Sequence, residues 1–143
     1  MPAPPADFLP HDRKSPLTDP WEPLFSRKVD GAVQLGLWID RPHTNSRGFA
    51  HGGLISALAD NAMGLTCGLA LDGGSSLVTV NLAVDFVGAA QIGQWLQVAP
   101  RLVRPGATLC FVEALVTADG QPCARANATF RVVGRKASAP RAA

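Results

Sequence analysis

Residues 43–60 read H-T-N-S-R-G-F-A-H-G-G-L-I-S-A-L-A-D, and this stretch decides the fold. A polar loop with one glycine leads into His-Gly-Gly at 51–53, and an apolar segment with helical spacing continues to residue 70. One acid, Asp60, lies in the middle of that segment, where an unpaired carboxylate would be costly. The stretch therefore predicts a long, wrapped helix over residues 51–70 and a carboxylate kept there for chemistry on an acyl group.

The segments around this helix have the alternating apolar pattern of strands. They cover residues 29–40, 77–87, 95–103, 108–118 and 122–133, with a loop at 41–50 and a turn at 72–75 that ends the helix. The order predicts an α+β fold in which a curved antiparallel sheet of five to six strands wraps one long central helix. Such a sheet leaves its edges unpaired, and edge pairing in a dimer is the simplest remedy.

The N-terminal segment has a different composition. Seven of the twelve prolines lie in residues 1–28, which excludes a long helix or a central strand there. Ser15-Pro16 predicts a short helical turn over residues 17–21, and Trp21, Leu24 and Phe25 are expected to pin this segment to the domain. We therefore divide the chain into a Pro-rich arm at 1–28, a domain at 29–134 and a disordered basic tail at 135–143.

The overall composition argues against several classes of protein. A net charge of +2 is too small to indicate binding to nucleic acid or to an anionic membrane. Neither a signal peptide nor a run of about 18 apolar residues is visible. The three cysteines lack disulfide or metal spacing, and His43 and His51 lack a convincing third ligand, so no metal is expected. These features favour a protein of the reducing cytoplasm.

The helix start and the acid are both suited to acyl chemistry. The amides of Gly52 and Gly53 have no intrahelical acceptor and could form an oxyanion hole, although the two glycines could equally serve only a tight loop-to-helix entry. Asp60 could act as a general base or nucleophile, or it could be a structural acid bonded to Ser56. Asp60 lies eight residues after Gly52, about 12 Å along one helix. One reacting carbonyl cannot reach both in one subunit, so the spacing favours a site shared by two chains.

These residues resemble the hotdog-fold acyl-CoA thioesterases, closest to the phenylacetyl-CoA and 4-hydroxybenzoyl-CoA thioesterase-like branch. The shared pattern is N-x-x-G-x-x-H-G-G-x-x-x-x-L-x-D, met by Asn45, Gly48, His51, Gly52, Gly53, Leu58 and Asp60. V-D-F at 84–86 and R-x-G-x-x-x-x-F-V-E at 104–113 also fit. The resemblance implies a helix enclosed by a sheet, homodimers with shared active sites, and commonly homotetramers.

The resemblance also implies roles for single residues. The Gly52 amide would polarise the thioester carbonyl, His51 and Asn45 would shape the loop, and Asn45 would place the attacking water. Asp60 of the second subunit would be the nucleophile or general base, and Thr79 would help to position the water. The resemblance implies no metal and no cofactor, since coenzyme A is part of the substrate.

Further residues are candidates for holding the substrate. Coenzyme A carries phosphates, and Arg47, Arg104 and Arg131 are the candidates to bind them, with solvated surface charges as the equal alternative. Gly53 is a further candidate to bind the substrate, and the acyl pocket is assigned to Phe49, Leu54 and Leu58.

The sequence therefore predicts a thioesterase that hydrolyses medium-chain or aryl-acyl-CoA. Two alternatives stay open: an acyl-CoA-binding module without turnover, and an enoyl-CoA hydratase-like enzyme. The second lacks the helical pairing of an acid with a histidine that proton transfer at carbon needs.

Overall fold

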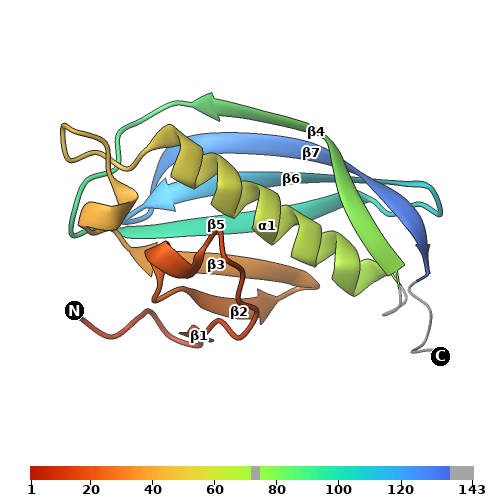
Figure 1. Ribbon diagram of the computed structural model, residues 1–143, viewed down its shortest axis with the longest axis horizontal. Coiled ribbons are helices and arrows are strands. Elements are labelled where there is room, and N and C mark those ends of the chain that lie inside the picture. Colours follow the sequence, from red (N-terminus) through yellow and green to blue (C-terminus); the bar gives the residue numbers. More distant parts are fainter. Residues whose placement is uncertain (72–74, 136–143) are drawn as a thin grey trace.

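The computed structural model describes residues 1–71 and 75–135. One long helix, α1 (Gly52–Ala70), crosses a curved seven-stranded sheet whose neighbouring strands are all antiparallel (Figure 1). The strand order is β1-β2-β3-β5-β6-β7-β4. The strands are β1 (Leu9–Pro10), β2 (Phe25–Val29), β3 (Ala32–Trp38), β4 (Ser75–Phe86), β5 (Trp95–Arg104), β6 (Leu109–Ala118) and β7 (Gln121–Arg135), with two 3-10 turns, η1 (Asp19–Trp21) and η2 (Arg41–His43). The α+β hotdog architecture is confirmed, and the sheet has more strands than the predicted five to six.

Helix α1 forms because apolar residues recur with helical spacing behind a capped start. Leu58, Ala59, Ala62 and Met63 are almost completely buried against the sheet. The last turn differs from the prediction of an all-round wrapped helix, because Leu69 is 44% exposed. By length and composition alone α1 could cross a membrane. Its buried side is instead part of the hydrophobic core.

The two faces of the sheet are set by simple alternation along its strands. On β6, Cys110, Val112, Ala114, Val116 and Ala118 are buried toward α1, and the residues between them face outward. On β7, Ala124, Ala126, Ala128 and Phe130 continue the buried face. The core therefore lies in one layer, between the helix and the concave side of the sheet.

The predicted single strand at 29–40 is wrong at its start. Asp30 and Gly31 form a tight turn with φ of 50° and 77°, and this turn separates β2 from β3. Asp-Gly favours such left-handed hairpin turns. The arm at 1–28 therefore supplies β1 and most of β2, which are the strands beyond those predicted, and residue 28 lies inside β2.

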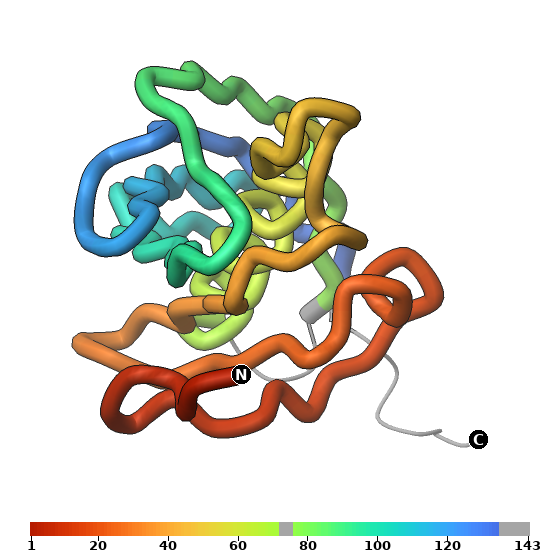
Figure 2. Tube along the Cα trace, turned by 90° about the vertical axis from the view of Figure 1, so that its left-hand side faces the viewer, coloured from red at the N-terminus to blue at the C-terminus, as the bar shows by residue number. Residues whose placement is uncertain are grey.

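The N-terminal arm is bound to the sheet by aromatic contacts, and Figure 2 shows it running along the lower side of the molecule. Phe8 is buried and its ring lies 5.1 Å from that of Trp95, edge to face. A Cβ on Gly36 would come within 2.2 Å of the Trp95 ring, so only glycine leaves room for it. Leu24 is buried in the core as expected, and η1 falls within the predicted helical turn at 17–21.

All three cysteines are free, buried thiols. Burial raises the pKa of both Cys67 and Cys123, and Cys110 beside Cys67 adds to its shift. Cys67 and Cys110 are packing residues, as expected. The predicted turn at 72–75 and the predicted tail at 135–143 lie almost entirely outside the described residues.

Candidate active site

The start of α1 leaves the backbone amide of Gly52 free. His51 is the N-cap, and its Nδ1 accepts a hydrogen bond from the Gly53 amide at 2.8 Å. The Gly52 amide has no acceptor within residues 1–71 and 75–135. The expectation of two available glycine amides therefore needs correcting: the cap engages Gly53, and of the two glycines only Gly52 keeps a donor for a ligand.

Asn45 organises the loop before the helix. Its Oδ1 accepts hydrogen bonds from the amides of Arg47 at 2.9 Å and Phe49 at 3.2 Å. The backbone amide of Asn45 donates to the Phe49 carbonyl at 2.8 Å, and Gly48 takes the left-handed φ of 81° that closes the turn. Asn45 thus shapes the loop, and its Nδ2 is the part of the side chain left for a water or a substrate.

The same loop is tied to the segment that follows β4. The Ala50 amide donates to the Ala90 carbonyl at 2.8 Å, and Phe49 forms a bridge with Gln91.

His43 is buried, with Nδ1 accepting from the Asp40 amide at 2.9 Å and Nε2 placed 2.9 Å from the Trp21 carbonyl. His43 is therefore a structural residue. Among the described residues no group of three His, Cys, Asp or Glu side chains is arranged to hold a metal ion.

Asp60 is half-buried in the middle of α1, and its partner is Thr79 on β4. The Thr79 hydroxyl donates to Asp60 Oδ1 at 2.7 Å. Ser56, the partner considered from sequence, instead donates to the Gly52 carbonyl at 2.8 Å. The carboxylate is therefore oriented by a neighbouring strand, and the hydrogen bond leaves its second oxygen free of a protein donor within the described residues.

A β-bulge aims Thr79 at Asp60. The pairing of β4 with β7 shifts between Thr79 and Asn81, so that Val80 is an extra residue. Leu82 and Val84 face the helix, and strict alternation from them would turn Val80 inward. The bulge turns Thr79 inward instead, opposite the buried Phe130. Sequence alternation carried no signal for this shift.

The two features lie at opposite ends of the same helical segment. At the Gly52 end, the ring of Phe86 comes within 3.1 Å of where a Cβ on Gly52 would lie. At the other end, Thr79 contacts Asp60. The rise of an α-helix puts about 12 Å between the two ends. We call them the amide end and the carboxylate end. Phe86 was not singled out from the sequence.

The remaining predicted residues are distributed over the molecule. Leu54 and Leu58 are buried in the hydrophobic core at 3% and 1% exposure. Arg47 is exposed, with its guanidinium carbon 5.9 Å from the centre of the Phe49 ring. Arg104 ends β5 and is exposed, and Arg131 lies exposed on β7. The structure thus brings Arg47 to the loop of the amide end, and it places Arg104 and Arg131 on the sheet.

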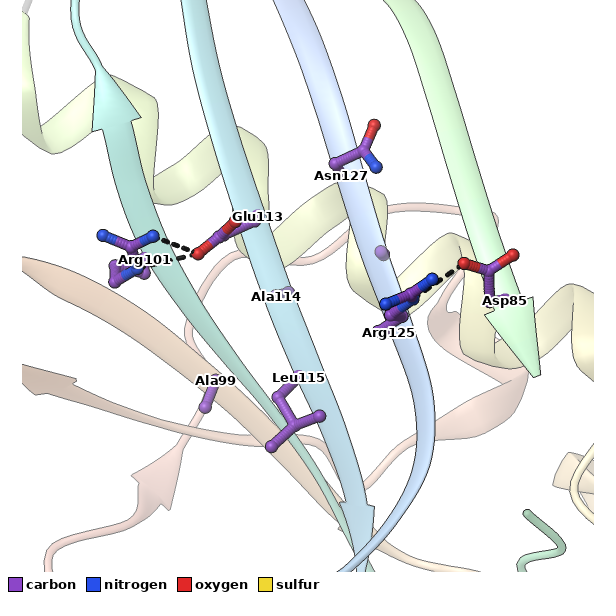
Figure 3. A pocket seen from close by; sticks show the side chains of 9 residues that line it. Asp85, Ala99, Arg101, Glu113, Ala114, Leu115, Arg125 and Asn127 are labelled. Atoms are coloured by element: carbon purple, nitrogen blue, oxygen red, sulfur yellow. Dashed lines mark hydrogen bonds and ion pairs between the residues drawn. The ribbon is translucent and has the colours of Figure 1, made fainter. Parts of the chain in front are cut away.

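A shallow depression of about 530 Å³ lies on the outward face of the sheet (Figure 3). Two ion pairs border it: Arg101 with Glu113, and Arg125 with Asp85, whose Nε and Oδ2 atoms are 2.8 Å apart. The depression contains none of the predicted site residues, and its arginines already have carboxylate partners. Asp85 is therefore an ion-paired surface acid.

A long helix enclosed by a curved antiparallel sheet is the hotdog architecture, and the comparisons place this chain among the hydrolases of that fold that act on thioesters. The chain belongs to the thioesterase superfamily, whose family model matches residues 47–124. A protein of Pseudomonas aeruginosa that carries the name "putative esterase" is 38% identical over 130 residues, which cover 90% of this chain and 96% of that protein. Human acyl-coenzyme A thioesterase 13 is 29% identical over 89 residues, which cover 61% of each chain.

Solved structures agree with this assignment. A phenylacetic acid degradation-related protein from Ralstonia eutropha is 28% identical, with a TM-score of 0.74 over 84% of this chain and 92% of that one. A Streptococcus mutans protein bound to acetyl CoA is 26% identical, with a TM-score of 0.70 over 81% of this chain and 93% of that one.

Proposed function

We propose that this thioesterase hydrolyses medium-chain or aryl-acyl-CoA to the free acid and coenzyme A. The observation that carries the proposal is the pair formed by an unpartnered Gly52 amide and an Asp60 carboxylate held by Thr79. The relatives support the coenzyme A moiety: one is named an acyl-coenzyme A thioesterase, and another was solved with acetyl CoA.

The proposed chemistry needs a donor, a base or nucleophile, and a good leaving group. The Gly52 amide donates to the thioester oxygen and stabilises the negative charge that develops there. Asp60 either removes a proton from a water that attacks the carbonyl carbon, or attacks that carbon itself and forms a mixed anhydride that water then hydrolyses to the free acid. The C–S bond then breaks and coenzyme A departs as a thiolate, which needs no strong general acid. No metal or further cofactor enters this scheme.

We propose that two subunits share each site. The amide and carboxylate ends are about 12 Å apart within one chain, too far to contact one carbonyl. Strand β4 lies at one edge of the sheet and exposes Val78 and Val80 by 50% and 52% (Figure 1). Antiparallel pairing of two β4 edges would set the amide end of one subunit beside the carboxylate end of the other, and would cover this apolar edge.

The register of that pairing follows from the side-chain directions on β4. Directly opposite residues of antiparallel strands point to the same face of a sheet. Ala83 lies midway between the two ends and faces outward, since its partner on β7 is Asn127. A two-fold axis at Ala83 would bring Phe86 of one subunit level with the bulge at Thr79 and Val80 of the other.

Subunit mixing tests the shared site. Asp60→Asn and Gly52→Pro each remove one half of the chemistry, and a heterodimer of the two variants contains one intact composite site. Equal mixing of inactive variants should restore about a quarter of the wild-type activity, because half of the dimers are mixed and each has one working site. No recovery on mixing would contradict the shared site.

A cysteine at the proposed two-fold axis tests the register. Ala83→Cys should form a disulfide dimer under mild oxidation, with Ala89→Cys as the matched control.

Binding without turnover is separated by a paired assay. Thermal-shift measurements with a series of CoA esters report binding, and release of free thiol reports hydrolysis. The proposed function requires both.

A hydratase-like activity is disfavoured because His43 is engaged by backbone groups and His51 caps the far end of the segment that carries Asp60.

We further propose that the protein acts in the cytoplasm, without nucleic-acid or membrane partners, and that its dimers can pair into homotetramers. Size-exclusion chromatography with light scattering measures the assembly, and dilution to a monomer should abolish specific activity.

A further inference from the structure

We propose that Phe86 determines acyl-group specificity, by forming the wall of the site beside the thioester carbonyl. The inference rests on the proposed function, because it takes the Gly52 amide as the donor to that carbonyl. It concerns the aromatic residue of V-D-F at 84–86, which lies outside the pattern at 45–60, at the end of β4 and 34 residues after Gly52.

Phe86 contacts the backbone at the start of α1. It is the last residue of β4 and lies opposite the buried Ala124, so its side chain is on the helix-facing side of the sheet. Its Cζ and Cε1 atoms would lie 3.1 and 3.4 Å from a Cβ on Gly52. A Cβ at position 52 would therefore press on the ring, which would have to shift by a few tenths of an ångström, and a group bound to the Gly52 amide must pass close to the ring.

The backbone that follows Phe86 is held in place by β7 and by the loop before the helix. The amides of Val87 and Gly88 donate to the Cys123 carbonyl at 3.0 and 3.2 Å, so the chain stays bound to β7 just beyond Phe86. A Cβ on Gly88 would lie 2.8 Å from the Pro122 carbonyl oxygen, which makes this approach possible only for glycine. Two residues later, Ala90 accepts the hydrogen bond from Ala50 in the loop before the helix.

Phe86 is nevertheless 54% exposed, which is unusual for a positioned aromatic ring facing the helix side of a sheet. A flat apolar surface beside a free amide donor suits a ligand with an apolar group next to a carbonyl. It offers dispersion contact to methylene groups or an aryl ring, and it lowers the water content around the donor. It offers little to an acetyl group, which ends one carbon beyond the carbonyl.

The expected signature is a change in the substrate profile and not only in the rate. Phe86→Ala should lower kcat/KM for octanoyl-CoA and phenylacetyl-CoA by about tenfold, the discrimination that apolar pockets typically supply. It should change kcat/KM for acetyl-CoA by less than twofold. Phe86→Leu, which keeps apolar bulk, should retain most of the preference for octanoyl-CoA and lose that for the flat aryl group.

Phe111→Ala is the matched control, because Phe111 is also a partly exposed phenylalanine but lies on the outward face of β6. It should leave the ratios between substrates unchanged. Each variant is also checked by light scattering and thermal denaturation, because β4 is the proposed dimer edge. Equal loss on all three substrates for Phe86→Ala and Phe86→Leu, with or without loss of the dimer, would overturn the specificity role. A wild-type protein inactive on every CoA ester would instead remove the proposed function, and this inference with it.

Discussion

The amide end and the carboxylate end of the same helical segment are built in different ways. At the amide end, the functional group is the backbone N–H of Gly52, left free because His51 satisfies the next amide. At the carboxylate end, the functional group is the side chain of Asp60, oriented by the hydroxyl of Thr79. The free N–H of Gly52 depends on local chain geometry. The orientation of Asp60 depends on the register between β4 and β7, two strands that lie far apart in the sequence.

This difference determines which substitutions should matter at each end. A backbone donor survives a change of side chain as long as the space allows it, and it is lost only when the N–H itself is removed. A carboxylate is lost on an isosteric change that leaves the packing intact. The two ends can therefore be tested with variants that preserve the fold and differ by one chemical group.

The largest effect is expected at the carboxylate end. Asp60→Asn keeps the size of the side chain and an oxygen acceptor for Thr79, but it removes the negative charge. The value of kcat on acyl-CoA should fall by roughly 10²–10⁴-fold, the contribution typical of a positioned base. Free-thiol release measures it, with Asp85→Asn as the control for loss of an acid on β4. Wild-type turnover of every cleaved substrate by Asp60→Asn would sink its assigned role.

Gly52→Pro tests the amide end with a slightly smaller expected effect. Proline is well tolerated at the first helical position, and His51 already has the extended backbone that precedes proline, with φ −69° and ψ 136°. Gly52→Ala is the matched control, because its Cβ meets the same Phe86 ring but its N–H is kept. The Gly52→Pro variant should have a kcat about 10²–10³-fold lower than that of the Gly52→Ala variant. Equal rates for the two variants would show that the amide is not the donor.

Thr79→Val separates orientation from chemistry at the carboxylate end. Valine keeps the shape of threonine and removes the 2.7 Å hydrogen bond to Asp60. We expect kcat to fall about tenfold, with KM nearly unchanged, which is the low end for losing a hydrogen bond to a charged group. Thr79→Ser restores the hydroxyl and should recover most of the rate. If serine is as slow as valine, the methyl packing and not the hydrogen bond is what matters.

Much of the fold could be predicted because its signals are local. The helix prediction matched to within one residue, since spacing and capping are properties of neighbouring residues. The break between the predicted strands at 108–118 and 122–133 matches the hairpin between β6 and β7, because Asp119-Gly120 is a strong local turn signal. The equivalent dipeptide Asp30-Gly31 was missed because the segment before it, F-S-R-K-V, is an outer strand of mixed polarity with little alternation. Its pairing partner, β3, was what made it a strand.

The residues proposed for the site could be chosen from the sequence, but the contacts between them could not. Gly52 and Asp60 stand out because a helix start and a lone acid on an apolar helix are visible in sequence. The bulge at Val80 is a matter of register between β4 and β7, so sequence alternation could not decide whether residue 79 or 80 faces the helix. Likewise, which glycine amide stays free depends on the direction of the His51 ring, a tertiary detail.

His51 gives the smallest expected effect and separates a cap from a catalyst. His51→Ala removes the acceptor of the Gly53 amide and should destabilise the protein by about 1 kcal/mol, measured by urea unfolding. His51→Asn supplies another N-cap acceptor and should recover that stability. Because the Gly52 amide and the Asp60 carboxylate are untouched in both variants, kcat should change less than in any variant above. If His51→Asn is as stable as the wild type yet as slow as Gly52→Pro, the imidazole itself contacts the substrate, and the amide end has a side-chain component after all.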